Sequence, residues 1–153
     1  MNETHQKATP LTIAAVSAVR ECADTMERQS ESLRRALSDL PMDAGLRERA
    51  LESSGALKDT SGRVMFELAL LQSEIDEGKA DTATALRRLS VLDAAMMEVV
   101  AGATELVDRL EQAAERDEQY EPAFVIVIEA VGLLMRELER ARAATAALAQ
   151  TAG

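Results

Sequence analysis

The sequence predicts an all-α protein, an up-down-up-down antiparallel four-helix bundle whose helices are each about 30 residues long. The first observation is the composition: 28 of the 153 residues are Ala and only 2% are aromatic, so Leu, Val, Ile and Met must fill the core, a mixture that favours helices. The second is that apolar residues recur at alternating spacings of three and four along four segments. The third is that short polar connections separate these segments, which favours antiparallel neighbours.

The first predicted helix covers residues 10–40. Thr9 supplies a capping hydroxyl, Pro10 has the fixed φ that suits the first helical position, and Pro41 ends the helix. Residues 1–8 show no periodicity and are expected to form a disordered N-terminal tail. The stripe expected to face the core, which we call the seam of the helix, consists of Ala15, Val19, Cys22, Met26, Gln29, Leu33, Ala36 and Leu40.

The second predicted helix covers residues 44–77, with Asp43 as its cap. It contains Gly55 and Gly62, each of which costs a helix about 1 kcal/mol relative to Ala. The apolar period continues in phase across both glycines, which favours one continuous helix over a break between them. Gly78 is suited to the left-handed conformation that ends a helix. The seam consists of Leu46, Ala50, Ser53 or Ser54, Leu57, Ser61, Val64, Leu68, Leu71 and Ile75, with Phe66 beside it.

The third and fourth predicted helices cover residues 81–116 and 122–149, and they begin at Asp81 and at Pro122. The third seam consists of Leu86, Leu89, Leu92, Met96, Val99 or Val100, Ala103, Leu106 or Val107, and Leu110. The fourth consists of Phe124, Val127 or Ile128, Val131, Leu134 or Met135, Leu138, Ala141 or Arg142, Thr145 and Leu148. The connection between the two helices holds the densest acidic cluster of the chain, with Glu111, Glu115, Asp117, Glu118 and Glu121.

These four helices are expected to form one domain over residues 9–150. The turns between them are short, so consecutive helices should run in opposite directions. The alternative is a pair of helical hairpins that becomes a bundle only on dimerising, because seams of this kind do not fix how many chains supply the helices.

Composition also limits the partners and the compartment. The net charge of −10 disfavours nucleic acid and anionic membrane surfaces, which bind proteins through Lys and Arg. The longest apolar stretch, residues 123–135, contains Glu129 and is shorter than the roughly 20 residues of a membrane-spanning helix, so no membrane span is expected. The polar start and the single cysteine favour a cytoplasmic protein. The excess of Arg over Lys and of Ala indicates a bacterial source.

The residues needed for most catalytic chemistry on such a bundle are missing from the sequence. A ferritin-like di-iron site needs two Glu-x-x-His motifs, and the only histidine is His5 in the expected tail. No glycine-rich phosphate-binding loop occurs. Cys22 lies on an apolar seam, where a buried small hydrophobe is expected rather than a reactive thiol. We therefore expect no catalytic residues, no metal and no cofactor.

Several carboxylates call for a separate interpretation. The pairs Glu67 with Glu74 and Glu105 with Asp108 are interpreted as solvated faces rather than cation sites, because 27 acidic residues on long helices produce such pairs by chance. Asp93 lies beside the third seam. It is expected at a boundary position with its oxygens reaching water, or, if buried, paired with an arginine. The two candidate arginines are Arg136 and Arg142.

One short pattern resembles a known family. In the segment from Asp108 to Gln112, an acid and an amide stand at positions i and i+4, and this spacing resembles that of the helical chemotaxis phosphatase. The resemblance covers five residues and implies that Asp108 contacts the phosphorylated partner while Gln112 orients the attacking water. The resemblance gives an alternative function, a regulatory phosphatase-like module. The competing interpretation is that the pair forms an ordinary hydrogen bond on the helix surface.

The third and fourth helices have more apolar positions than one core-facing stripe can use. Either the bundle packs on both sides of each helix, or the surplus forms an interface with a second copy or another protein. Methionines at 96, 97 and 135 could line an adaptable groove or fill the core. The candidate interface residues are Phe124, Ile126, Ala130 and Leu133 on the fourth helix and Val91, Ala94, Met97 and Ala101 on the third.

The function predicted from the sequence is a non-catalytic bundle that mediates protein–protein interaction as an adaptor, secretion chaperone or assembly factor, with a homodimer expected. This prediction depends on the surplus apolar surface and on the missing catalytic groups. Besides the phosphatase-like alternative, a further alternative is a bundle that binds a small hydrophobic ligand in its core.

Overall fold

The computed structural model describes residues 9–152, and four long helices account for most of them. They are α1 (Pro10–Asp39), α2 (Ala44–Asp76), α3 (Thr82–Arg116) and α4 (Glu121–Ala152), with the short 3-10 helix η2 (Glu118–Tyr120) before α4. The predicted all-α four-helix bundle is confirmed, and the predicted helix ends lie within three residues of the observed ones. The tail predicted at residues 1–8, with His5, lies outside the described residues.

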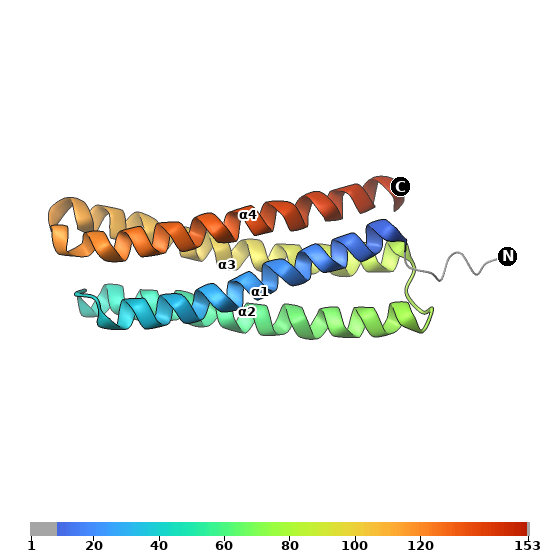
Figure 1. Cartoon of the computed structure of the whole chain (residues 1–153), viewed down its shortest axis with the longest axis horizontal. Helices are drawn as coiled ribbons and strands as arrows, with labels where there is room; N and C mark the ends of the chain where they lie inside the picture. The colour runs from blue at the N-terminus through green and yellow to red at the C-terminus, as the bar shows by residue number, and fades with distance from the viewer. Residues whose placement is uncertain (1–8, 153) are drawn as a thin grey trace.

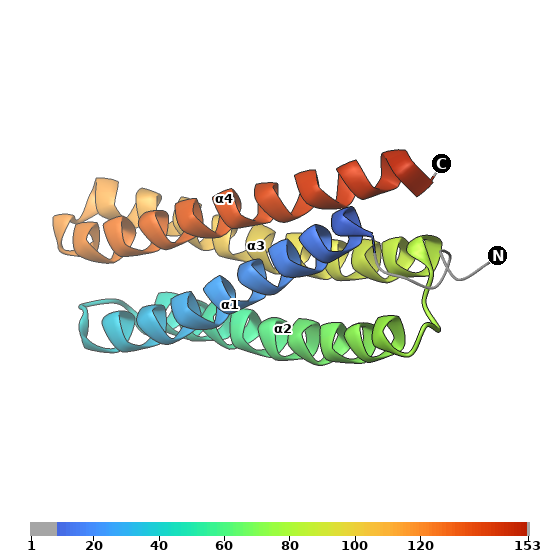
Figure 2. The same cartoon turned by 45° about the vertical axis from the view of Figure 1, so that its right-hand side comes forward.

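The four helices alternate in direction along the bundle (Figure 1). The α1–α2 turn and the α3–α4 connection lie at one end, and the α2–α3 connection lies at the other, where α1 begins and α4 ends (Figure 1). Both views place α3 beside α4 and α1 beside α2, while α1 runs obliquely across the bundle and also packs on α4 (Figures 1 and 2). No helix within residues 9–152 is long and apolar enough to cross a membrane.

Side-chain caps begin the first three helices as the sequence predicts. Thr9 Oγ1 accepts a hydrogen bond from the N–H of residue 12 at 3.0 Å, and Pro10 occupies the first turn. Asp43 and Asp81 accept the equivalent bonds from residues 46 and 84, each at 2.8 Å. The bond to the backbone N–H of residue 84 holds the pKa of Asp81 below its usual range. These bonds satisfy amide groups that have no partner inside the helix.

Helix α2 is continuous through Gly55 and Gly62, as the phase of its seam predicts. Both glycines are exposed, and a Cβ added at either would meet no other atom within 4 Å. The helix is stabilised instead by its buried stripe, which packs on the neighbouring helices along its whole length. It ends at Asp76, and Gly78, two residues later, has a φ of 73°, in the left-handed region predicted for it.

The core runs the length of the bundle and is almost entirely aliphatic. The largest fully buried side chains are Met26, Leu33, Leu37, Leu57, Leu68, Leu71, Leu89, Met96, Leu110, Leu134, Leu148 and Val19. Cys22 is buried with them, as predicted. The expected position of Phe66 beside the α2 seam is wrong, since 62% of Phe66 is exposed. It follows the buried Val64 by two residues, which turns it about 200° around the helix.

Polar contacts tie the two turns at one end of the bundle. The Tyr120 hydroxyl accepts a hydrogen bond from the Asp43 N–H at 3.1 Å and donates to Asp43 Oδ2 at 3.2 Å. Arg47 donates to the carbonyls of Leu37, Ser38 and Leu40, each at 2.9 Å. The guanidinium therefore caps the C-terminal end of α1, where carbonyl groups have no helical partner.

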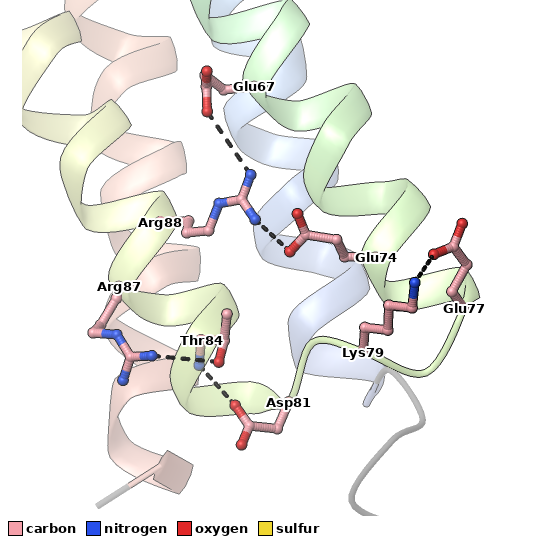
Figure 3. Close-up of polar contacts among 8 residues, drawn as sticks. All are labelled: Glu67, Glu74, Glu77, Lys79, Asp81, Thr84, Arg87 and Arg88. Carbon is pink, nitrogen blue, oxygen red and sulfur yellow. Dashed lines mark hydrogen bonds and ion pairs between the residues drawn. The ribbon is translucent and has the colours of Figure 1, made fainter.

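At the opposite end, Arg88 links α3 to α2. Its guanidinium lies between two carboxylates of α2, with Nη2 3.8 Å from Glu67 and Nη1 bonded to Glu74 (Figure 3). The two carboxylates are 40% and 38% exposed, in keeping with the solvated face expected for them. The sequence did not predict that they also neutralise a guanidinium that is only 27% exposed.

Candidate functional site

A groove with a volume of about 370 Å³ runs between α3 and α4. Its two edges carry Met97 of α3 and Met135 of α4, which are 40% and 47% exposed. Val100 and Leu138 are buried in its floor, where they belong to the core. The remaining lining residues are Ala101, Thr104, Glu139 and Arg142.

The sequence produces this groove through the residues that flank the two seams. On α3, Met96 is fully buried, so the next residue, Met97, is turned to the edge of the core-facing stripe. The following positions on the same edge, at spacings of four and three, are Ala101 and Thr104. Their side chains are too short to reach across to α4, which leaves the floor of the groove open between the two methionines.

The structure divides the α3 residues of the predicted interface between two flanks. Met97 and Ala101 line the groove beside α4. Val91 is 70% exposed but lies beside α2, in a separate hollow of about 540 Å³ that also contains Arg88. Ala94 is exposed between these two flanks. The predicted α3 residues are therefore accessible, but they do not form one surface.

Most of the α4 residues predicted to form the interface are buried or partly buried and cannot contact a partner freely. Ala130 is 3% exposed and belongs to the core, and Phe124 and Ile126 are partly buried against it. Only Leu133, at 41%, is exposed. The physical reason is that α1 covers this flank: Arg140, one heptad after Leu133, pairs with Glu21 of α1 at 3.8 Å.

Sequence reasoning placed the accessible flank of α4 incorrectly. Ile128 and Met135 are 44% and 47% exposed, and they are seven residues apart, on the edge of α4 that faces the groove. The sequence contains a signal for this edge, because Met135 is one of the methionines predicted either to line a groove or to fill the core. The pattern also offers Met135 or Leu134 for the seam, and Leu134 is the one that is fully buried.

Acidic residues continue the α3 edge of the groove towards the α3–α4 turn. From Thr104 the same helical spacing leads to Asp108, Glu111 and Glu115, all of which are exposed. On α4, Glu139 lines the groove directly. Beyond the far end of this stripe is an open hollow of about 1040 Å³. It is lined by Asp117, Glu118, Gln119, Glu121, Pro122, Val125 and Ile126.

The one arginine that lines the groove is already paired. Arg142 Nε lies 3.5 Å from Asp93 Oδ1, so Arg142 is the partner among the two arginines that the sequence offered. The expectation that both carboxylate oxygens reach water is wrong, because Oδ1 is buried and accepts no hydrogen bond from residues 9–152. Burial raises the pKa of Asp93, and the charge of Arg142 opposes that rise.

Cys22 is enclosed by the same part of the bundle. Burial raises the pKa of its thiol to about 12, and the negative charges of Glu137 and Asp93 act in the same direction. At neutral pH the thiol therefore remains protonated, and it is also inaccessible. Both properties make it a poor nucleophile and metal ligand.

Asp108 and Gln112, the pair in the phosphatase-like pattern, are both exposed on α3, one helical turn apart. Their side chains make no hydrogen bond to each other in the described part of the chain. Within residues 9–152, no three His, Cys, Asp or Glu side chains are arranged to hold a metal ion. Glu105 and Asp108, the other carboxylate pair, are both exposed.

Comparison of the chain with known proteins found no matching family model, no matching curated protein and no matching solved structure.

Proposed function

We propose that this chain is a non-catalytic protein that mediates protein–protein interaction through the groove between α3 and α4, as an adaptor, secretion chaperone or assembly factor in a bacterial cell. The observation that carries the proposal is the pair of half-exposed methionines, Met97 and Met135, on facing edges of an apolar groove. Unbranched methionine side chains adapt to different partner surfaces and gain free energy when a partner removes them from water.

The shape of the groove favours a partner helix over a small molecule. It is open along two helices, with an apolar floor formed by Val100 and Leu138. A small ligand is usually enclosed on most sides, whereas an amphipathic helix binds by laying one apolar stripe into such a groove.

A photo-crosslinking experiment tests the proposal. A photoreactive residue is placed at Met135 in the groove or, as a control, at Phe66, which is at least as exposed but lies on α2. We expect a discrete crosslink to another protein from position 135 and none from position 66, and its loss when Met97→Asp is added. Equal crosslinking from both positions would show that contact with other proteins is not confined to the groove.

The phosphatase-like alternative keeps one supporting observation, namely that Asp108 and Gln112 are both exposed on the same outer face of α3. Gln112→Ala distinguishes it from the proposal. If the chain dephosphorylates response regulators and Gln112→Ala removes that activity, the function is catalytic. The proposed interaction protein shows no such activity in either form.

The core-ligand alternative requires space between the helices. That space is occupied by large, fully buried side chains such as Leu89, Met96 and Leu134. Native mass spectrometry of the purified chain tests this alternative directly, because a tightly bound hydrophobic ligand would add its mass to that of the protein.

A further inference from the structure

We infer that the partner of the α3–α4 groove is a basic amphipathic helix of another protein. The inference deepens the proposed function and rests on it, since it identifies the chemistry of the segment that binds in that groove. Three features of the same face support it: the position of the apolar groove, the acidic stripe beside it, and the pairing of the one arginine that lines the groove.

The apolar and acidic parts of this face are separated along the α3 axis. Met97, Ala101 and Thr104 occupy one half of the edge, and the acids from Asp108 to Glu115 occupy the other half. From residue 97 to residue 115 the edge is about 27 Å long at 1.5 Å per residue. A partner helix of about 18 residues therefore matches both parts, with apolar anchors in one half and Lys or Arg in the other.

Within residues 9–152, the side chains of Asp108, Glu111, Glu115 and Glu139 form no ion pair with Lys or Arg. Arg142 is held by Asp93 at 3.5 Å, so its charge is already neutralised. The acids of the stripe continue into the hollow lined by Asp117, Glu118 and Glu121. With a net charge of −10, the whole chain also attracts cationic segments at long range, which speeds their association.

The same charges argue against a second copy in this groove. In a two-fold symmetric dimer the same face is buried on both chains, so the interface would enclose two copies of its acids, among them Glu111 and Glu139. Like charges brought together at an interface are costly, whereas Lys and Arg at those places would form complementary pairs.

Three synthetic peptides of about 18 residues test the inference. The first carries leucines at helical spacing in one half and lysines at helical spacing in the other half, the second has glutamate in place of lysine, and the third is a scrambled form of the first. Binding of each to the full chain is measured by fluorescence anisotropy at physiological ionic strength. We expect the lysine peptide to bind at least tenfold more tightly than the other two.

Matched variants separate groove binding from general attraction to an acidic protein. Met97→Asp with Met135→Asp should abolish binding, and Glu111→Lys with Glu139→Lys should weaken it about tenfold, as expected for loss of favourable charge pairs. The control, Glu48→Lys with Asp59→Lys, changes the net charge equally on exposed positions of α2 and should leave binding within twofold. Circular dichroism verifies that each variant keeps its helices.

Four results would overturn the inference. If the lysine and glutamate peptides bind equally, and both lose binding in the methionine double variant, the groove binds helices without regard to charge and the proposed function stands. Lysine-peptide binding that survives the methionine changes would be unspecific attraction, and no binding at millimolar peptide would exclude a basic helix. A dimer in sedimentation that dissociates in the methionine double variant would identify a second copy as the occupant.

Discussion

The contact between α1 and α2 and the contact between α3 and α4 are formed by different kinds of side chain. Between α1 and α2, the buried hydroxyls of Ser54 and Ser61 donate hydrogen bonds to the α1 carbonyls of Ser30 and Ala23, each at 2.6 Å. Such short side chains can reach a neighbouring backbone only where the two helices lie close together. Between α3 and α4, the seam is closed by aliphatic side chains, and Met97 and Met135 remain half exposed at its edge.

The difference shows how residue size divides apolar surface between interior and exterior. Serine on a seam lets two helices approach so closely that little of their facing surface remains exposed to water. Its hydroxyl is satisfied by a hydrogen bond to a backbone carbonyl. Between α3 and α4, aliphatic side chains such as Leu89, Met96 and Leu134 fill the core without such hydrogen bonds. The groove lies at the edge of this contact, where the short side chains of Ala101 and Thr104 do not reach α4.

The largest difference in unfolding free energy is expected between variants of two neighbouring methionines of α3. Met96 is fully buried and Met97 is 40% exposed. Met96→Ala should lower the free energy of unfolding by about 2–5 kcal/mol, since it removes a buried side chain and leaves a cavity. Met97→Ala should lower it by less than about 1 kcal/mol. Urea denaturation measures both, and similar losses would mean that the groove edge is part of the core.

The α1–α2 contact and the α3–α4 groove should differ in how much stability a larger side chain costs. Ser61→Leu overfills the close contact between α1 and α2 and removes a hydrogen bond, so the free energy of unfolding should fall by about 1–3 kcal/mol. Ala101→Leu adds the larger side chain to an open groove and should change stability by no more than about 0.5 kcal/mol. Thermal denaturation followed by circular dichroism compares them, and an unchanged Ser61→Leu variant would contradict close packing of this seam.

The turn between α1 and α2 should depend on Arg47. Its guanidinium donates to three carbonyls at the end of α1, so Arg47→Met should cost about 1–2 kcal/mol of unfolding free energy. Arg49→Met, at an exposed position two residues further along α2, is the matched control and should cost less than about 0.5 kcal/mol. Equal losses of unfolding free energy in the two variants, measured by chemical denaturation, would contradict the role of Arg47 in capping α1.

The smallest expected effect is on the pH dependence of the free energy of unfolding, through Asp93 on the α3–α4 side of the bundle. Burial raises the pKa of Asp93 in the folded chain, so its contribution to stability is present below the ordinary aspartate pKa and is lost as the pH rises through the raised value. Asp93→Asn cannot lose a proton, so its stability relative to the native chain should increase over that pH range. Arg142→Met removes the charge that opposes the rise in the pKa of Asp93. In this variant the contribution of Asp93 to stability should therefore be lost over a range that extends to higher pH. Urea denaturation across the acidic range measures these differences, and a difference between Asp93→Asn and the native chain that does not vary with pH would contradict the burial of this carboxyl.

The fold was predictable because its signals are local. The caps at Thr9, Asp43 and Asp81 and the left-handed Gly78 are each determined by a few consecutive residues. The continuous course of α2 followed from the unbroken phase of its seam. The candidate site was only partly predictable, because Met97 and Ala101 were placed correctly while Ala130 was not.

The sequence alone determined which residues share a face of each helix, since this depends only on a period of about 3.6 residues. Only the tertiary structure decided which neighbour covers each edge of that face. In α4, one edge packs on α1 and buries Ala130, while the other edge leaves Met135 beside the groove. The outcome depends on the oblique course of α1 and on the arrangement of all four helices, and no local pattern in the chain carries that information.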